Sequence, residues 1–285
     1  MEIRLIATDM DGTFLADDKK APTENIEALE ECAARGIEIV PATGRTVRGI
    51  PDEIRSLPGV RYAITTNGAV VVDLKEDRIL STCRLSAELA VRIMTMARDS
   101  ADDIMYDAYV EGVGCTTDYF YRNMERYISS PEVRALVQKT RQPVPDNIAC
   151  VRDRGRDVDK INLFFRSEEA RQRMRTALRA VPGILVTSSI SNNLEINAEG
   201  ADKGGALLRL AEYLGIRVCE TMAFGDGEND LSMIKSAGIG VAMKNGEKIV
   251  REAADYVTGT NNEAGVAGAI RKLVLRTDMS AAADV

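Results

Sequence analysis

Residues 3–13 read IRLIATDMDGT, a short apolar stretch that ends in two carboxylates, Asp9 and Asp11. The stretch from Ile3 to Thr8 predicts a β-strand. In open α/β sheets ligands collect at the carboxyl ends of the strands, so both acids are well placed to act on a ligand. On this motif alone, an Asp-Gly turn that ends an edge strand is an equally good interpretation.

Helical and strand-like patterns alternate after this stretch. A helix is predicted from Thr23 to Arg35, with its first residue as the N-cap and Gly36 just past its last turn. Strand-like runs follow from Ile37 to Pro41 and from Tyr62 to Thr66. The alternation predicts an α/β fold, a doubly wound parallel sheet with helices on both faces.

The pattern changes after a hairpin predicted at residues 70–82. Residues 83–188 contain more polar helices and a Tyr-rich segment, and we interpret them as an inserted second domain. From residue 189 the alternation resumes, with a strand at Leu194 to Asn197 and a helix at Lys203 to Leu214. The predicted core therefore comprises residues 1–82 and 189–285.

A second acidic motif, Gly225-Asp226-Gly227-Glu228-Asn229-Asp230, follows another buried strand and precedes a helix. Asp230 could simply cap that helix, but capping does not explain Asp226. The spacing fails the dinucleotide-binding fingerprint, because an acid replaces the third glycine and would repel a pyrophosphate. The motif therefore disfavours a Rossmann cofactor site.

The two acidic motifs would meet at one edge of a parallel sheet. Two unit charges about 4 Å apart interact by roughly 4 kcal/mol at an effective dielectric of 20, so four carboxylates need protons or a cation between them. Oxygen ligands without histidine or cysteine favour a hard ion, and Mg²⁺ commonly takes one or two carboxylates plus water and substrate phosphate. The sequence predicts a Mg²⁺ site.

Two further motifs suggest contacts to an anion. Thr43-Gly44-Arg45 lies between a strand and a predicted helix, where a hydroxyl and free backbone N–H groups can bind an anion. In isolation, Thr43 as a plain N-cap is the better interpretation. Lys203 opens a helix, where its charge opposes the helix dipole by about 0.3–1 kcal/mol, so an anionic partner would explain its position.

Composition narrows the possible chemistry. The net charge of −7 disfavours nucleic acid and anionic membrane surfaces as partners. The absence of histidine excludes a Ser-His-Asp site and an H-E-x-x-H zinc site within the chain. The five cysteines form no C-x-x-C pair and indicate free thiols in a reducing compartment. With an N-terminus unlike a signal peptide, we expect a cytoplasmic protein.

The order of the four motifs resembles the haloacid dehalogenase (HAD) superfamily, in which strand-DxD, strand-Thr/Ser, Lys and strand-GDxxxD follow one another. The forms D-x-D-G-T and G-D-G-x-N-D, with an insertion between the Thr and Lys motifs, are similar to its Cof-type branch, which carries a C2 cap there. The resemblance implies a Rossmann-like HAD core with an inserted α/β cap domain at 83–188. It also implies a Mg²⁺-dependent phosphatase.

By this resemblance, Asp9 is the nucleophile that forms a phosphoaspartate, and Asp11 is the general acid and base. The metal ligands would be Asp9, the backbone carbonyl of Asp11, and Asp226, with Asp230 orienting the metal-bound water or phosphate.

Phosphate and substrate contacts are also implied. The residues expected to make them are Thr43, Gly44, Lys203 and Asn229, with Arg45 and Asn67 facing the substrate.

Other functions stay open at this stage. A phosphosugar mutase or other phosphotransferase would use the same nucleophile, and a non-catalytic phosphometabolite sensor would keep the same pocket. The substrate is expected to be a small phosphorylated metabolite, a sugar phosphate first, bound by a monomer or homodimer. Within the cap, Asp107, Tyr109 and Arg166 are polar candidates for contact with the leaving group.

Overall fold

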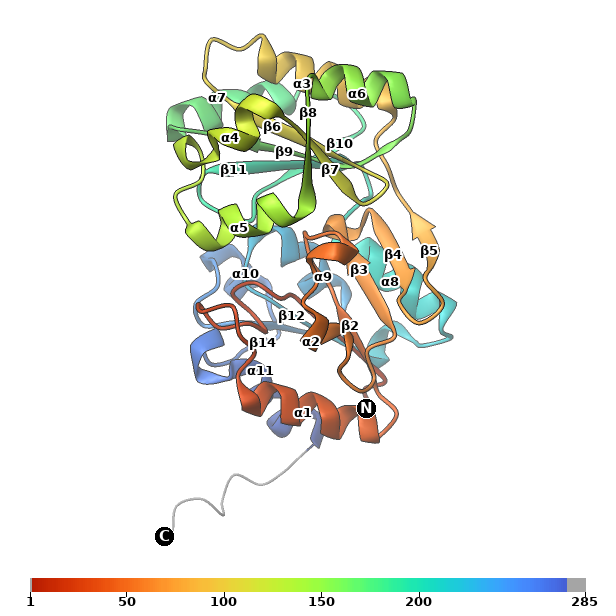
Figure 1. Cartoon of the computed structure of the whole chain (residues 1–285). Helices are drawn as coiled ribbons and strands as arrows, with labels where there is room; N and C mark the ends of the chain where they lie inside the picture. Colours follow the sequence, from red (N-terminus) through yellow and green to blue (C-terminus); the bar gives the residue numbers. More distant parts are fainter. Residues whose placement is uncertain (1, 276–285) are drawn as a thin grey trace.

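A computed structural model describes residues 2–275 and divides the chain into a core and a cap (Figure 1). The cap, with a six-stranded sheet, sits above the core in the view of Figure 1. Residue 1 and residues 276–285 of the predicted core lie outside the described part of the chain. Within the described part, no helix combines the length and the apolar character needed to cross a membrane.

The core is built on a parallel five-stranded sheet in the order β14-β13-β12-β1-β2. The strands are β1 (Leu5–Thr8), β2 (Glu38–Pro41), β12 (Thr221–Gly225), β13 (Ile239–Ala242) and β14 (Tyr256–Val257). Strand β1 pairs with β2 on one side and with β12 on the other. The chain therefore winds outward in both directions from β1, which makes the carboxyl end of β1 a topological switch point.

Helices cover both faces of this sheet because β1 is apolar on both sides. Ile6 packs in the cluster that contains Leu29 of α1, whereas Leu5 packs in the cluster that contains Leu207 of α8. A strand buried on both faces is typical of a doubly wound parallel sheet, so the predicted fold class is confirmed. The core helices are α1 (Thr23–Ala34), α8 (Lys203–Tyr213), α9 (Leu231–Ser236), α10 (Lys248–Ala253) and α11 (Gly265–Ile270).

The start of α1 differs from the prediction. Thr23 is the first helical residue, and the N-cap is Pro22, which has no side chain to accept a hydrogen bond. The predicted end is correct, because Gly36 follows the helix with a φ of +76° that favours glycine.

An antiparallel sheet of β3 (Tyr62–Thr65), β4 (Val70–Asp73) and β5 (Arg78–Thr82) extends the core beside β2. The predicted hairpin at 70–82 is therefore confirmed. The helix predicted after Arg45 is reduced to a single 3₁₀ turn, Val47–Gly49, and a four-residue helix, α2 (Asp52–Arg55).

The cap contains a six-stranded sheet in the order β10-β11-β9-β6-β7-β8, in which every pair is antiparallel except β7 with β8. Its strands are β6 (Met105–Val110), β7 (Val113–Thr117), β8 (Arg141–Val144), β9 (Val158–Phe164), β10 (Ile184–Thr187) and β11 (Asn193–Ala198). Its helices are α3 (Ala87–Arg98), α4 (Asp118–Arg122), α5 (Pro131–Thr140), α6 (Asn147–Arg154) and α7 (Glu168–Leu178). Helix α5 lies on the side of the cap that faces the core (Figure 1).

The predicted boundary at residue 188 needs correction. The strand expected to begin the second half of the core, β11, pairs with β9 of the cap sheet from Asn193 to Ile196. An apolar strand pattern does not reveal which sheet it joins, because both sheets bury a strand in the same way. The cap sheet thus extends to Ala198, and the chain re-enters the core just before α8.

Candidate active site

The carboxyl ends of β1, β2 and β12 carry the predicted site residues to one edge of the core sheet. Asp9 follows β1, and its backbone N–H donates to the carbonyl of Phe224 in β12. Asp226 follows β12 directly, and Thr43 follows β2 after one residue. Residues separated by more than 200 positions thus lie side by side because parallel strands end at a common edge.

Lys203 lies at the centre of this cluster. It is fully buried, and its Nζ donates to Asp9 Oδ1 at 2.6 Å and to Asp230 Oδ1 at 2.5 Å. It is the first residue of α8, whose N-cap Asp202 accepts from the backbone N–H of Gly205. The carboxylates of Asp9 and Asp230 are the anionic partners that we expected for a lysine at the N-terminus of a helix, where its charge opposes the helix dipole.

Asp230 is held from its other oxygen as well. Its Oδ2 accepts from the backbone N–H groups of Asp226 and Gly227, both at 3.0 Å. The side chain makes no capping hydrogen bond to α9, so the capping interpretation of Asp230 is wrong. Instead, Asp230 accepts hydrogen bonds from the backbone of its own loop, residues 225–230, and also binds Lys203.

Asp226 is positioned by the turn after β1. The hydroxyl of Thr13 donates to Asp226 Oδ1 at 2.6 Å, a contact that sequence patterns did not predict. Gly12 has a φ of +84°, and a Cβ there would lie 2.5 Å from Asp226 Oδ2. Only glycine fits this close approach between the two acidic motifs.

The acid cluster carries an excess of negative charge. Burial, and then repulsion from Asp230, raise the pKa of Asp9 well above its usual range although Lys203 acts to lower it. Burial and then Asp230 raise the pKa of Asp226 to about 7. Burial lowers the pKa of Lys203, but Asp230 and Asp9 outweigh burial and raise it overall. A single lysine does not balance three carboxylates.

This donor set fits a hard divalent cation. Asp9, Asp226 and Asp230 each offer a carboxylate oxygen, and these oxygens lie within 4.8 Å of one another. Oxygen donors without nitrogen or sulfur suit Mg²⁺, whose charge would relieve the repulsion that raises the two pKa values. The Asp11 side chain is not part of this group; its expected contribution is its backbone carbonyl.

Asp11 points instead toward two cations. Arg45 donates two hydrogen bonds to it, from Nε to Oδ2 at 2.8 Å and from Nη2 to Oδ1 at 2.7 Å. Lys19 Nζ donates a third, to Oδ1 at 3.0 Å. Burial raises the pKa of Asp11, but Arg45 and then Lys19 outweigh burial and hold it below its usual value. Asp11 is therefore an ionised carboxylate in this arrangement.

The loop after β2 differs from the predicted anion site at a helix N-terminus. The Thr43 hydroxyl accepts from the backbone N–H of Arg45, and helical structure begins only at Val47. Thr43 and Gly44 nevertheless line the pocket above the acid cluster. The Gly44 carbonyl accepts from Lys160 of the cap at 2.6 Å.

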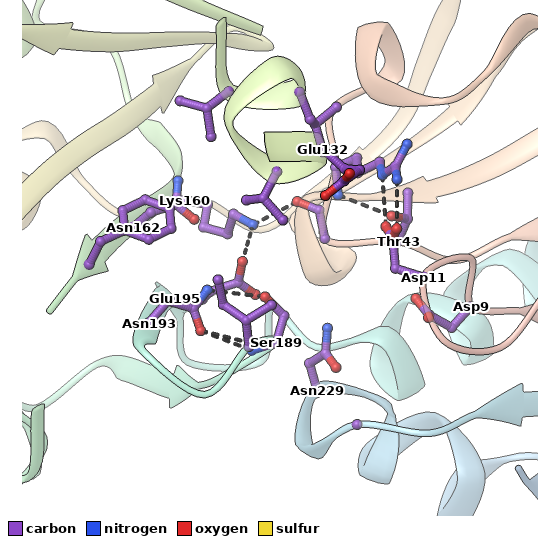
Figure 2. Close-up of a pocket in the computed structure, with 18 of the residues that line it drawn as sticks. Asp9, Asp11, Thr43, Glu132, Lys160, Asn162, Ser189, Asn193, Glu195 and Asn229 are labelled. Atoms are coloured by element: carbon purple, nitrogen blue, oxygen red, sulfur yellow. Dashed lines mark hydrogen bonds and ion pairs between the residues drawn. The ribbon is translucent and has the colours of Figure 1, made fainter. Parts of the chain in front are cut away.

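A pocket of about 170 Å³ lies between this edge of the core and the cap. Figure 2 shows Asp9 and Asp11 on the core side, with Lys160 and Glu195 facing them from the cap. Helix α5 contributes Glu132 to the rim (Figure 2). The cap thus covers the acid cluster and forms the wall that a bound leaving group would contact.

The family model for haloacid dehalogenase-like hydrolases matches residues 6–270. The chain belongs to this family. Its relatives include 5-amino-6-(5-phospho-D-ribitylamino)uracil phosphatase YcsE of Bacillus subtilis, which is 33% identical over 279 residues and covers 96% of this chain and 97% of the relative. Putative phosphatase YxeH of Bacillus subtilis is 33% identical over 297 residues and covers 95% of this chain and 98% of the relative.

Solved structures agree with this assignment. A haloacid dehalogenase-like hydrolase from B. subtilis superimposes with a TM-score of 0.82 at 29% identity, covering 95% of this chain and all of the other. One from Bacteroides thetaiotaomicron gives 0.79 at 28% identity, covering 95% of this chain and 99% of the other. The predicted family, and with it the predicted enzyme class, a phosphatase of the HAD type, are confirmed.

Within this HAD-type site, the structure brings together most of the predicted residues. Asn229 lines the pocket, whereas Asn67 is buried beside it and donates to Glu195 Oε2 at 2.7 Å and to Asn197 Oδ1 at 3.2 Å. Asn67 thus ties the core to the cap rather than facing the pocket. Arg45 lines the pocket, but its donors are engaged by Asp11 and by the Gly49 carbonyl.

The cap candidates separate into two groups. Tyr109 lines the pocket, and Asp107 lies behind it, paired with Arg141 at 3.0 Å. Arg166 is half exposed, pairs with Asp103 and does not line the pocket. Arg141, Lys160 and Glu195 were missed, because no motif marks a residue that reaches the site through strand register alone.

Proposed function

We propose that this chain is a Mg²⁺-dependent phosphatase that hydrolyses a small phosphorylated metabolite through a phosphoaspartate on Asp9. The observation that carries the proposal is the position of Asp9. Its carboxylate lines the pocket, accepts a hydrogen bond from Lys203, and lies close to the carboxylates of Asp226 and Asp230. A carboxylate held there by a buried cation can attack a phosphate ester that enters from the cap side.

Lys203 orients the proposed nucleophile. It binds Asp9 Oδ1, whereas Oδ2 has no hydrogen-bond partner among residues 2–275. We assign the attack on phosphorus to this second oxygen: its bond to phosphorus forms as the bond from phosphorus to the leaving oxygen breaks. Asp9, Asp226 and the backbone carbonyl of Asp11 would hold Mg²⁺. When bound, the ion would supply positive charge that stabilises the transferring phosphoryl group.

Asp11 is the proposed acid and base. In the second half of the reaction its ionised form takes a proton from the water that attacks the phosphoaspartate. It gives that proton to the leaving alcohol oxygen of the next substrate, so protons balance over one turnover. The pairing with Arg45 and Lys19 supports the ionised form that the water step needs.

The remaining predicted residues would contact the phosphoryl oxygens. Thr43, Gly44 and Asn229 line the same pocket as Asp9. Their hydroxyl, backbone N–H and amide donors suit the charge that spreads over the oxygens during transfer.

We propose a sugar phosphate, or a related polyol phosphate, as the substrate class. Two relatives, YcsE and the Escherichia coli protein YbjI, are named as phosphatases of 5-amino-6-(5-phospho-D-ribitylamino)uracil. YbjI is 28% identical over 282 residues, and it and this chain cover each other almost completely. A cytoplasmic location is part of the proposal, supported by five cysteines that form no disulfide.

The direct test is turnover of p-nitrophenyl phosphate by the purified chain with and without Mg²⁺. We expect release of inorganic phosphate that stops after treatment with EDTA and returns with added Mg²⁺. A panel of sugar and polyol phosphates would then rank substrates by kcat/KM. Absence of turnover with every ester in the presence of Mg²⁺ would refute the proposed activity, and release of an isomer instead of phosphate would indicate a mutase.

A further inference from the structure

Two buried ion pairs form the cap side of the pocket. Lys160 Nζ lies 2.7 Å from Glu195 Oε1, and the two side chains are 3% and 5% exposed. Arg141 Nε lies 3.0 Å from Asp107 Oδ2, with 5% and 0% exposed. Each pair has zero net charge, and each cation already has a carboxylate at hydrogen-bonding distance.

The cations on the core side are also paired, but there two cations share one carboxylate. Lys19 and Arg45 both bind Asp11, and Arg45 uses its remaining nitrogen on the Gly49 carbonyl. Among the described residues, every lysine and arginine that lines the pocket is therefore paired with a carboxylate. In the described part of the chain Glu132 at the rim has no lysine or arginine at ion-pair distance, and its charge offsets the extra positive charge of the Lys19, Arg45 and Asp11 group.

Lys160 has little freedom to bind a second anion. Its ammonium group also donates to the Gly44 carbonyl at 2.6 Å, so two of its three protons are engaged. Glu195 is held in turn by Asn67. Redirecting Lys160 toward a ligand would leave Glu195 buried without its cation, which proteins strongly disfavour.

From this charge balance we infer that the enzyme selects phosphate esters whose leaving group is uncharged. The inference rests on the proposed phosphatase function. A carboxylate or second phosphate on the leaving group would contact a cap wall without an available cation and would lie near Glu132 and Glu195. Like charges brought together in this way oppose binding and give specificity.

The rest of the cap wall suits such a neutral group. Val133 and Leu136 of α5 and Phe164 of β9 provide apolar surface, and Asn162, Ser189 and Asn193 provide amide and hydroxyl groups. This mixture can contact a carbon skeleton and bind hydroxyl or amide substituents. The class of leaving group is therefore a neutral sugar, polyol or uncharged ring.

The test compares matched esters that differ by one charge: 4-carbamoylphenyl phosphate with 4-carboxyphenyl phosphate, and glucitol 6-phosphate with 6-phosphogluconate. We expect kcat/KM for the anionic ester to be at least about tenfold lower in each pair that is hydrolysed. Equal or higher kcat/KM for an anionic ester would overturn the inference while leaving the phosphatase function intact. Hydrolysis of no ester at all would refute both.

Substitutions of the acidic residues at the pocket provide a second test of the inferred charge selectivity. Glu195→Gln leaves Lys160 without its carboxylate and should raise the anionic-to-neutral ratio of kcat/KM by about fivefold or more. Glu132→Gln, at an exposed position that does not threaten folding, should raise it by about twofold. Glu169→Gln, an exposed cap residue outside the pocket, is the matched control and should leave the ratio unchanged. An unchanged ratio in folded Glu132→Gln and Glu195→Gln would contradict the inference; if Glu195→Gln does not fold, Glu132→Gln alone decides.

Discussion

The core and the cap each contain a buried lysine: Lys203 lies in the acid cluster of the core, and Lys160 lies in the cap wall of the pocket. Lys203 contacts two carboxylates, Asp9 and Asp230, which outweigh burial and raise its pKa. Lys160 contacts one carboxylate, Glu195, which does not outweigh burial, and its pKa is lowered. The two lysines thus differ in the number of carboxylates that they contact. Lys203 is the cation of the acid cluster, whereas Lys160 balances the charge of Glu195 in the cap.

The two regions also differ in how their residues reach the pocket. In the core, each group follows the end of a parallel strand or starts a helix, so local sequence determines its place. In the cap, Lys160 and Glu195 lie within strands that are adjacent only because β9 pairs with β11. We therefore expect substitutions in the core to affect the reaction itself and substitutions in the cap to affect which ester is bound.

The largest effect is expected for Asp9→Asn. Removing the proposed nucleophile should lower kcat by at least about 10³-fold. The thermal midpoint should stay the same or rise, because the change removes a buried carboxylate whose pKa is raised by repulsion. Phosphate release and circular dichroism melting measure both, with the exposed Asp18→Asn as control. Turnover near that of the unmodified enzyme would contradict the role of Asp9.

Lys203→Met should come next. Leaving Asp9 and Asp230 without their cation should lower kcat/KM by roughly 10²-fold and the free energy of unfolding by about 3–5 kcal/mol. Adding Asp230→Asn should recover part of the stability but not the activity. Recovery of both would show that Lys203 has only a structural role.

Lys160→Met sharpens the comparison between the two lysines. It removes the bond to Gly44 and the partner of Glu195, so we expect kcat/KM to fall by about tenfold, mainly through a higher KM. The same substitution should therefore act on kcat in the core and on KM in the cap. If Lys160→Met lowers kcat as much as Lys203→Met does, the proposed division between the regions is wrong.

The smallest effect concerns the pH dependence of metal binding. Folding raises the pKa of Asp226 to about 7. Between about pH 4 and 7 the metal-free folded chain therefore binds more protons than the unfolded chain. Its free energy of unfolding consequently falls as the pH rises through this range. Mg²⁺ competes with those protons. At pH 8, Mg²⁺ at about 100 times its Kd should raise the thermal midpoint by roughly 5–10 °C. At pH 5 the same concentration should raise it less; an equal rise at both pH values would argue against carboxylate ligands.

Much of the core could be predicted from sequence because its signals are local. Apolar strands that end in Asp9 and Asp226, and a lysine in an unfavourable helix position, each mark a place that the parallel topology then brings together. The helix expected after Arg45 is replaced by a 3₁₀ turn before Pro51 and a four-residue helix after it, and this proline is the sequence signal that the prediction did not use.

The cap was harder to predict because its site depends on register. Nothing in the local pattern shows that Arg141 at the start of β8 stacks on Tyr109 of β6, or that β11 joins the cap sheet. The grip of Arg45 on Asp11 was missed for a similar reason, because it joins two loops through side chains alone. Side-chain partners across non-adjacent elements carry no sequence signal in a single chain.

The central claim is that Asp9 carries the phosphoryl group during turnover. The most direct measurement is reduction by borohydride during steady-state hydrolysis, followed by peptide mass spectrometry, because an acyl phosphate is reduced to an alcohol and converts the aspartate to homoserine. The account predicts homoserine at position 9, dependent on substrate and Mg²⁺ and absent from Asp9→Asn. Homoserine at another aspartate, with Asp9 unmodified during full turnover, would contradict it.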